Sequence, residues 1–574
     1  MHTVETVLLV LMLGALTGIA ARYVRAIPLP LIQIALGALI AWPQDGLHIA
    51  FDPELFLLLF IPPLLFADGW RILKREFFAL AKPILLLAFG LVFITVFGLG
   101  YLIHWMIPSI PLTVAFALAA VVSPTDAVAV SAISRNLGMP SKTMHLLEGE
   151  SLLNDASGLV ALKFAVAATL TAGSFSWENA AKDFTWMSVG GLGLGALMGW
   201  GFSRGRDMVT RRVGDVAATQ MVLLLILLPF ASYIMGEYIG VSGILSAVAA
   251  GIATNFADLD RSNFISERLQ TEGTWSMVEA AFNGAIFLLL GLQLPSIIGE
   301  TLRGAAHRDV WLLLGYVAAI SCALLALRWA WLMLGVRSSL HKAHRQGRMV
   351  ERPSALLTLA TTVAGIRGAV TLAAALSIPT HLANGRVFPE RNLLIFLATG
   401  TILFTLVLGS IVLPLLLRRI PPVEDTQAQH EERLARTAAC QAAIASLALP
   451  EDQAQQHSAQ WLAQHQEVAG RITQEYRNRI QLLDESGVAN TPEAQSDSPE
   501  VVHERRLRYL REIELRLHCI QVERNTLYAE RQAHRINDEM LRSMVSELDM
   551  SEVSLRKRLA VARRAVGLPP LEGH

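Results

Sequence analysis

Two short segments of the chain place carboxylates beside hydroxyl and amide side chains in otherwise apolar surroundings. The first is the run Ser-Pro-Thr-Asp at residues 123–126, and the second is the run Glu-Ser-Leu-Leu-Asn-Asp at residues 150–155. Carboxylate, hydroxyl and carbonyl oxygens are the ligands that hard cations prefer. Such oxygens around one carboxylate near the middle of a membrane suit a small monovalent cation, so the two runs predict a cation site around Asp126 and Asp155.

The first segment is expected to interrupt a helix. Pro124 has no backbone N–H and its ring clashes with the preceding turn, so the helix opens there. The opening frees backbone carbonyls beside Ser123, Thr125 and Asp126. These carbonyls add oxygen ligands to the carboxylate of Asp126.

The second segment is expected to stay helical. Ser151, Asn154 and Asp155 are spaced at i, i+3 and i+4, and therefore lie on one face of the helix. Glu150 lies about 100° around the helix from Ser151 and can face a different neighbour. The face that carries Asp155 is predicted to complete the cation site.

Further ionisable residues lie inside apolar stretches, where each costs at least about 2.5 kcal/mol to insert into a membrane. Two of them, Arg328 and Arg367, are basic and must find acids or carbonyls. Glu150 is the natural partner, because a permanently paired Asp126 or Asp155 would lose its affinity for a cation. The remaining polar residues in these stretches are Asp68, Glu279 and the amide Asn283. Each of them either belongs to the cation site or makes a structural polar contact between helices. Lys163 either pairs with an acid or extends toward the outer face of the membrane, and extension is the preferred interpretation.

Composition separates the chain into two regions. Hydrophobic residues make up 53% of the 574 residues and charged residues only 17%, whereas a soluble chain carries about 25% charged residues. Charged residues occupy about one position in eight before residue 418 and more than one in four after it. Residues 1–418 are therefore predicted to form a transmembrane domain, and residues 419–574 a helical tail that is regulatory or dimerising.

The transmembrane domain is predicted to be all-α with about 13 spans, because a spanning helix needs about 20 mostly apolar residues. With the N-terminus outside, the cytoplasmic loops hold 19 Lys and Arg residues and the outer loops hold 5, as the positive-inside rule requires. The tail is then cytoplasmic. The expected spans are residues 6–21, 27–42, 54–70, 83–104, 111–133, 145–171, 184–203, 218–235, 239–255, 276–297, 310–336, 355–379 and 392–417.

The order of the spans indicates an internal repeat. Spans 111–133 and 355–379 each stand second to last in a block of six, and the later one is weakened by Gly365 and Gly368. Interrupted helices in corresponding places are typical of inverted repeats that cross around a site at the membrane midplane. We therefore predict inverted repeats with two crossed interrupted helices.

The tail is predicted to be rich in helix. Residues 426–448 and 453–483 favour helix, and residues 486–502 are expected to form a flexible linker. Within residues 504–548 an apolar residue recurs at every third or fourth position for two heptads. A coiled coil would explain this spacing, but an amphipathic helix packed on its neighbours is the preferred interpretation.

Other classes of protein find little support. The net charge is zero, so nothing indicates a nucleic-acid partner. The three cysteines form no metal-ligand or disulfide pattern, and neither an H-E-x-x-H motif nor a complete nucleophile elbow is present. The chain is therefore expected to be no enzyme and to need no cofactor. A cation channel or a membrane cation sensor is the alternative to a transporter.

The polar segments together resemble the bacterial members of the cation:proton antiporter-1 family, the NhaP-like Na⁺/H⁺ exchangers. The resemblance covers roughly residues 5–418 and also rests on residues 287–292 (Phe-Leu-Leu-Leu-Gly-Leu) and 365–369 (Gly-Ile-Arg-Gly-Ala). It implies a homodimer among the lipids of the bacterial inner membrane, with a dimerisation domain and a moving core. It also implies exchange of cytoplasmic Na⁺, or K⁺ or Li⁺, for external H⁺, with K⁺/H⁺ exchange as the alternative.

The resemblance assigns roles to individual residues. Asp155 would be the ion-binding carboxylate, and Asn154 in place of a second aspartate goes with electroneutral exchange in this family. Glu150 would form a structural ion bridge with Arg328 or, as the second candidate, with Arg367. The other implied contributors to a Na⁺ (or K⁺) site are Asp126, Thr125, Ser151 and Asp68.

Overall fold

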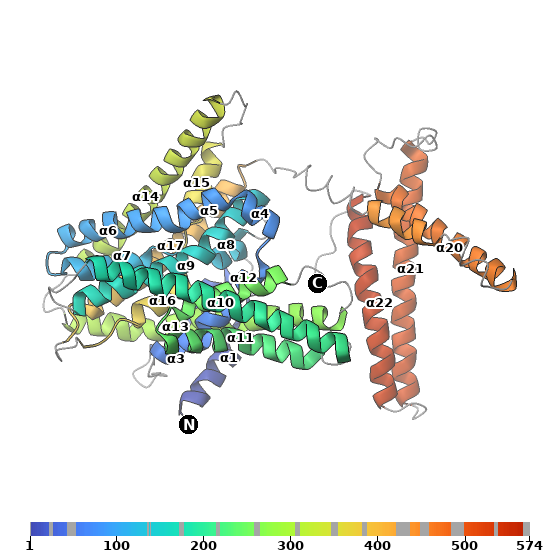
Figure 1. Ribbon diagram of the computed structural model, residues 1–574, viewed down its shortest axis with the longest axis horizontal. Helices are drawn as coiled ribbons and strands as arrows, with labels where there is room; N and C mark the ends of the chain where they lie inside the picture. The colour runs from blue at the N-terminus through green and yellow to red at the C-terminus, as the bar shows by residue number, and fades with distance from the viewer. Residues whose placement is uncertain are drawn as a thin grey trace. The chain divides into compact units, whose positions relative to one another are not determined.

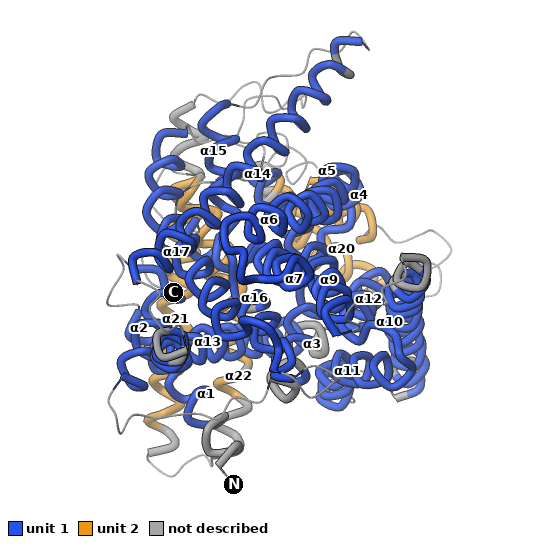
Figure 2. Tube along the Cα trace, turned by 90° about the vertical axis from the view of Figure 1, so that its left-hand side faces the viewer, with its two compact units in different colours: residues 1–423 blue, residues 424–574 orange. Residues whose placement is uncertain are grey.

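The computed structural model of the protein (Figure 1) divides into two compact units, Met1–Val423 and Glu424–His574, which Figure 2 shows in two colours. The structure describes residues 2–21, 27–42, 53–134, 137, 139–170, 177–213, 218–257, 265–304, 310–345, 354–381, 387–420, 437–447, 459–483, 499–532 and 538–565.

One helix bundle of the first unit is built around α12 and α13. Helix α12 packs along α3 and α10, and α13 packs along α1 and α2. The helices of this first bundle are α1 (His2–Ala20), α2 (Leu29–Ala41), α3 (Pro53–Arg71), α10 (Trp177–Val213), α11 (Ala218–Ile239), α12 (Gly243–Ala257) and α13 (Ile265–Gly304).

Small residues set the spacing inside this first bundle. Gly191, Gly195 and Gly199 follow one another every four residues along α10, on the side that meets α12. A Cβ atom at Gly195 would lie 2.0 Å from the carbonyl oxygen of Ser246. The backbones of α10 and α12 therefore approach closely. Small residues repeated every fourth position allow such an approach between membrane helices.

A second bundle is built around α9 and α17, which contact more of the other member helices than any other member does. Helix α7 is buried along nearly its whole length, which places it in the interior of this bundle. The members are α4 (Lys74–Ala79), α5 (Ala81–Leu85), the π-helical segment η1 (Leu86–Leu91), α6 (Val92–Met106), α7 (Leu112–Val122), α8 (Ala127–Ser134), α9 (Ser141–Leu170), α14 (Val310–Arg345), α15 (Ala355–Val363), α16 (Ala369–Leu376) and α17 (Arg391–Leu417).

Every predicted span overlaps one helix or a consecutive series of helices, and the all-α prediction is confirmed. The described residues contain no strand beyond an isolated bridge between His381 and Val387. In that same part of the chain, 7 helices are long and apolar enough to cross a membrane. The number of crossings, about 13, stays a prediction.

The two predicted interrupted helices are present, and they cross at their breaks. Helix α7 ends at Val122 and α8 begins at Ala127, while α15 ends at Val363 and α16 begins at Ala369. The Asp126 amide donates to the Ile366 carbonyl at 2.8 Å, which joins one break to the other. Unwound backbone in a membrane must find such partners inside the protein.

An ion pair joins the two bundles. Lys163 Nζ on α9 lies 3.0 Å from Glu237 Oε1 on α11, and both side chains are about 40% exposed. Of the two alternatives for Lys163, the structure therefore shows the pairing with an acid and not the preferred one. Exposed pairs of this kind contribute only about 0–1 kcal/mol to stability.

The second unit contains helices α20 (Ala459–Leu483), α21 (Pro499–Gln532) and α22 (Asp538–Ala565). Helices α21 and α22 pack antiparallel, and Leu510 and Ile513 bury their side chains against Leu559 and Ala562. Near the other end, Arg524 pairs with Asp549 and Glu552. Hydrogen bonds from Arg524 and Arg556 lower the pKa of Glu552.

This packing agrees with an amphipathic helix that contacts its neighbour. The predicted linker at residues 486–502 lies outside the described residues up to position 498, and its last four residues belong to α21 instead. The linker prediction is therefore wrong at its C-terminal end. Of the predicted helical segments, 426–436 and 448–458 also lie outside the described residues.

Candidate functional site

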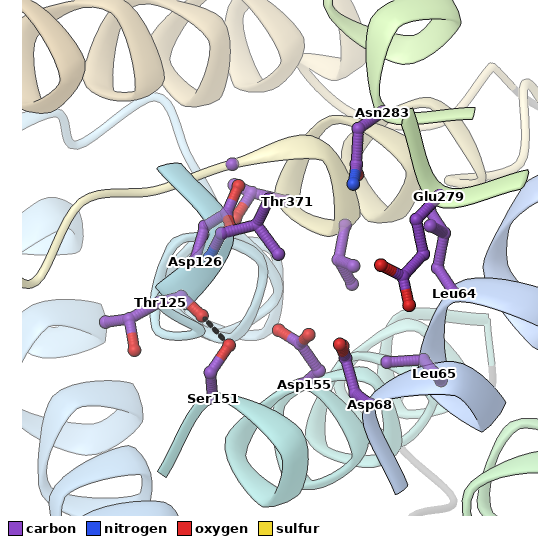
Figure 3. A pocket seen from close by; sticks show the side chains of 13 residues that line it. Leu64, Leu65, Asp68, Thr125, Asp126, Ser151, Asp155, Glu279, Asn283 and Thr371 are labelled. Carbon is purple, nitrogen blue, oxygen red and sulfur yellow. Dashed lines mark hydrogen bonds between the residues drawn. The ribbon is translucent and has the colours of Figure 1, made fainter. Parts of the chain in front are cut away.

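A small cavity lies where the two breaks, α9 and two helices of the first bundle meet (Figure 3). Its volume is about 40 Å³, which exceeds the roughly 10–15 Å³ that one water molecule needs. The first bundle contributes α3 and α13 to the wall, and the second bundle contributes the rest. The polar side chains that line the cavity are Asp68, Thr125, Asp126, Ser151, Asp155, Glu279, Asn283 and Thr371.

Asp126 stands at the first break and caps α8. Its Oδ1 accepts hydrogen bonds from the amides of Val128 at 2.8 Å and Ala129 at 3.0 Å. A carboxylate in this place satisfies unpaired amides and complements the positive end of the helix dipole. On its other side, a Cβ atom at Gly368 would lie 1.8 Å from Asp126 Oδ2, so the second break leaves room for this carboxylate only because residue 368 is a glycine.

Ser151 and Asn154 hold the first break against α9. The Ser151 hydroxyl donates to the Thr125 carbonyl oxygen at 2.8 Å, and the Ala127 amide donates to the same hydroxyl at 3.3 Å. The Asn154 amide group donates to the Thr125 hydroxyl at 2.8 Å. Asn154 is 1% exposed and does not line the cavity. The geometry thus gives Asn154 a supporting position beside the predicted site rather than a place in its wall.

Asp155 lies on α9, one turn after Ser151, and its carboxylate points into the cavity (Figure 3). The residue is 6% exposed. Within the described part of the chain, no hydrogen bond or ion pair engages this carboxylate, in contrast to that of Asp126. A buried charge without a protein partner is costly. The oxygens of Asp155 are therefore available to a cation or a proton.

Asp68 enters the cavity from the opposite wall, on α3, after the Pro62-Pro63 pair that lies within this helix. It is close enough to Asp126 and Asp155 for their charges to interact. The two bundles thus face each other with carboxylates on both sides. A monovalent cation between them would reduce the repulsion among like charges.

Glu150 and Arg328 form a buried ion pair beside the cavity. Both terminal guanidinium nitrogens of Arg328 donate to the Glu150 carboxylate, Nη2 to Oε2 at 2.8 Å and Nη1 to Oε1, and both side chains are 1% exposed. Arg328 Nε also donates to the Thr361 carbonyl oxygen at 3.2 Å. The pair therefore joins α9, α14 and α15 within the second bundle.

The other candidate partner, Arg367, binds backbone instead of a carboxylate. Its Nε donates to the Val122 carbonyl oxygen at 2.9 Å, and its Nη1 donates to the Gly365 carbonyl oxygen. It is 3% exposed. Arg367 thus satisfies carbonyls in both breaks, which answers the need of unwound backbone in an apolar environment. Between the two arginines, the geometry favours Arg328 as the partner of Glu150.

Glu279 and Asn283, which the sequence alone left unassigned, line the cavity from α13, and Thr371 lines it from α16. Glu279 and Asn283 are spaced at i and i+4, so the sequence predicts that they share one face of a helix. The sequence does not predict which neighbouring helices this face contacts. Among the described residues, no group of three or more His, Cys, Asp or Glu side chains could hold a resident metal ion.

Comparisons with known proteins agree with this geometry. The family described as "Sodium/hydrogen exchanger, transmembrane" matches residues 8–419. The chain is 42% identical over 556 residues to the "Uncharacterized Na(+)/H(+) exchanger YjcE" of Escherichia coli (strain K12), with 96% of this chain and 98% of that protein covered. It is 46% identical over 412 residues to the "Sodium, potassium, lithium and rubidium/H(+) antiporter" of Bacillus subtilis (strain 168), with 71% of this chain and 61% of that protein covered.

The fold is also similar to that of a solved structure, the sodium proton antiporter MjNhaP1 from Methanocaldococcus jannaschii. The TM-score is 0.55 at 17% identity, and the match covers 73% of this chain and 99% of that chain. The fold similarity, the family match and the relatives agree with the resemblance seen in the polar segments. The chain belongs to the sodium/hydrogen exchanger family.

Proposed function

We propose that this protein is a secondary-active antiporter that exchanges cytoplasmic Na⁺, with K⁺ and Li⁺ as further substrates, for external H⁺. The observation that carries this proposal is the Asp155 carboxylate, which faces the cavity without a partner among the described residues. The names of the relatives support Na⁺ as the principal cation and do not favour exchange restricted to K⁺. Because the relatives are transporters, we also propose that the chain has no enzymatic activity.

Competition for the same oxygens explains how one site exchanges two ions. A carboxylate holds either a proton or a metal cation, and binding of one excludes the other by mass action. A site with several unneutralised carboxylates is costly to move through a low-dielectric region. Only the loaded site therefore crosses, which couples the two fluxes. Residue 154 is an asparagine, so the site carries one negative charge fewer than it would with a second aspartate there. This supports an electroneutral exchange of one cation for one proton.

The architecture supports movement of one bundle against the other. Asp126 and Asp155 belong to the second bundle, whereas Asp68 and Glu279 belong to the first. We propose that the second bundle carries the ion and that the first bundle forms a homodimer in the lipid of the bacterial inner membrane. The excess of Lys and Arg in alternate loops supports an outer N-terminus and a cytoplasmic tail that is regulatory or dimerising.

Purified protein in sealed vesicles with an internal pH dye tests the proposed exchange. With an acid interior, addition of Na⁺ outside is expected to raise the internal pH, and choline at equal ionic strength is expected to have no effect. Li⁺ and K⁺ are expected to act at higher concentrations. A permeant anion such as thiocyanate, which collapses the membrane potential without supplying a transported cation, leaves the rate of an electroneutral exchange unchanged. No pH response to any of these monovalent cations would contradict the proposal.

Gly368→Ala is expected to remove most of the exchange while the protein remains folded. The new methyl group would displace the Asp126 carboxylate, which lies 1.8 Å from the position of the added Cβ. The matched control is Gly193→Ala on α10, where an added Cβ meets nothing within 4 Å. The measurement is the rate of Na⁺-driven pH change together with the elution profile in detergent. Equal rates for the two variants would show that the close contact at Gly368 does not matter.

A further inference from the structure

A second, larger cavity adjoins the small one. It has a volume of about 610 Å³, and it shares Val128 and the polar residues Asp68, Ser151, Glu279 and Asn283 with the small cavity. Its wall continues to residues that the small cavity does not touch, namely Arg71, Glu76, His145 and Glu148. An ion that travels between the two cavities therefore passes the shared residues.

Glu279 stands at this passage with its two carboxylate oxygens in different surroundings. Oε2 accepts a hydrogen bond from Arg71 Nη1. Oε1 is buried and has no hydrogen-bond partner among the described residues. The carboxylate points toward Asp68 and Asp155 (Figure 3). One side of the group is thus neutralised, and the other side is presented to the cation pathway.

Arg71 lies on the side of Glu279 that faces the larger cavity. Its side chain is 41% exposed, compared with 18% for Glu279, and it lines the larger cavity only. A half-exposed guanidinium keeps its charge and much of its hydration. A metal cation can therefore replace Arg71 beside Glu279, because the displaced guanidinium stays solvated and is not left as an unpaired buried charge.

We propose that Glu279 is a specificity-determining residue that sets the affinity for the transported cation, and that Arg71 reduces this affinity by competing for the Glu279 carboxylate. This inference rests on the proposed antiport. In the empty state Arg71 neutralises Glu279. An entering cation takes the place of Arg71 between Glu279 and Asp68, assisted by the Asn283 side chain, and then moves on to Asp155.

A purely structural role for the pair makes a different prediction. Arg71 and Glu279 join α3 to α13, which belong to the same bundle and also contact each other elsewhere. If the pair only ties these helices together, removal of either partner has the same effect. If Glu279 attracts the cation and Arg71 opposes it, the two removals have opposite effects on the apparent KM for Na⁺.

The test compares Glu279→Gln and Arg71→Gln in vesicles at a fixed pH, with Na⁺ varied. Glu279→Gln is expected to raise the apparent KM on the order of tenfold, because one attractive charge near the path is lost, with little change in Vmax. Arg71→Gln is expected to lower the apparent KM severalfold. In the double variant, Arg71→Gln is expected to have lost its effect, because its target carboxylate is absent.

The matched control is Glu76→Gln, which removes a carboxylate from the larger cavity but not from the passage. It is expected to keep the wild-type KM. Shifts of KM in the same direction for Glu279→Gln and Arg71→Gln, or a Glu279→Gln variant indistinguishable from Glu76→Gln, would overturn the inference. So would a folded Glu279→Gln variant that loses Vmax at unchanged KM. Failure of the wild type to exchange at all would instead count against the proposed function.

Discussion

Asp155→Asn is expected to abolish cation–proton exchange while leaving the fold intact. Asparagine has the same shape but cannot carry a proton between the two sides of the membrane, and its amide has no negative charge to hold Na⁺. The neighbouring Asp126 cannot take over, because its Oδ1 is engaged by the amides of Val128 and Ala129. The measurement is Na⁺-driven pH change in vesicles, and the expected rate is that of vesicles without protein.

The thermal stability of Asp155→Asn separates loss of the site from loss of the fold. Asp155 lies near Asp68 and Asp126, and removal of one of three neighbouring like charges relieves repulsion. The melting temperature in detergent is therefore expected to stay the same or to rise. The control variant, Asp183→Asn, changes an exposed carboxylate on α10 and is expected to leave exchange unchanged. Exchange at the wild-type rate in Asp155→Asn would show that the ion binds elsewhere.

Glu150→Gln is expected to cause the largest loss of stability among single substitutions near the site. It leaves the guanidinium of Arg328 charged and buried, because both side chains are 1% exposed. Removal of one partner from a buried ion pair costs about 3–5 kcal/mol. The measurement is the melting temperature in detergent, which is expected to fall by several degrees. Na⁺ preference over Li⁺ and K⁺ in the surviving protein is expected to change little.

Two comparisons make this second prediction specific to the buried pair. Glu237→Gln breaks the half-exposed pair with Lys163, where side chains are about 40% exposed, and exposed pairs contribute only about 0–1 kcal/mol. It is expected to melt near the wild type. The double variant Glu150→Gln, Arg328→Met removes the stranded charge and is expected to recover part of the lost stability. Unchanged melting of Glu150→Gln alone would count against a structural role for the pair.

Local chemistry in the sequence was sufficient to predict much of this protein. Pro124 cannot continue a helix, and the glycines at 365 and 368 weaken one, so both interruptions followed from properties of single residues. Ser151 and Asp155 share a face because of helical periodicity alone. The long apolar runs with so few charges predicted an all-α membrane domain, since only helices and closed barrels satisfy backbone groups in lipid.

Only the tertiary structure decided which distant groups meet. Local chemistry allowed either Arg328 or Arg367 to pair with Glu150, and only the resemblance put Arg328 first. The outcome depends on how α14, whose Arg328 lies 178 residues after Glu150, packs against α9. The same holds for Glu279, whose place at the passage depends on the packing of α13 against α3 and the second break. Asn154 shares a helical face with Asp155, yet it supports Thr125 instead of lining the cavity. Periodicity states which residues share a face of a helix, whereas close packing of the neighbouring helices determines what that face meets.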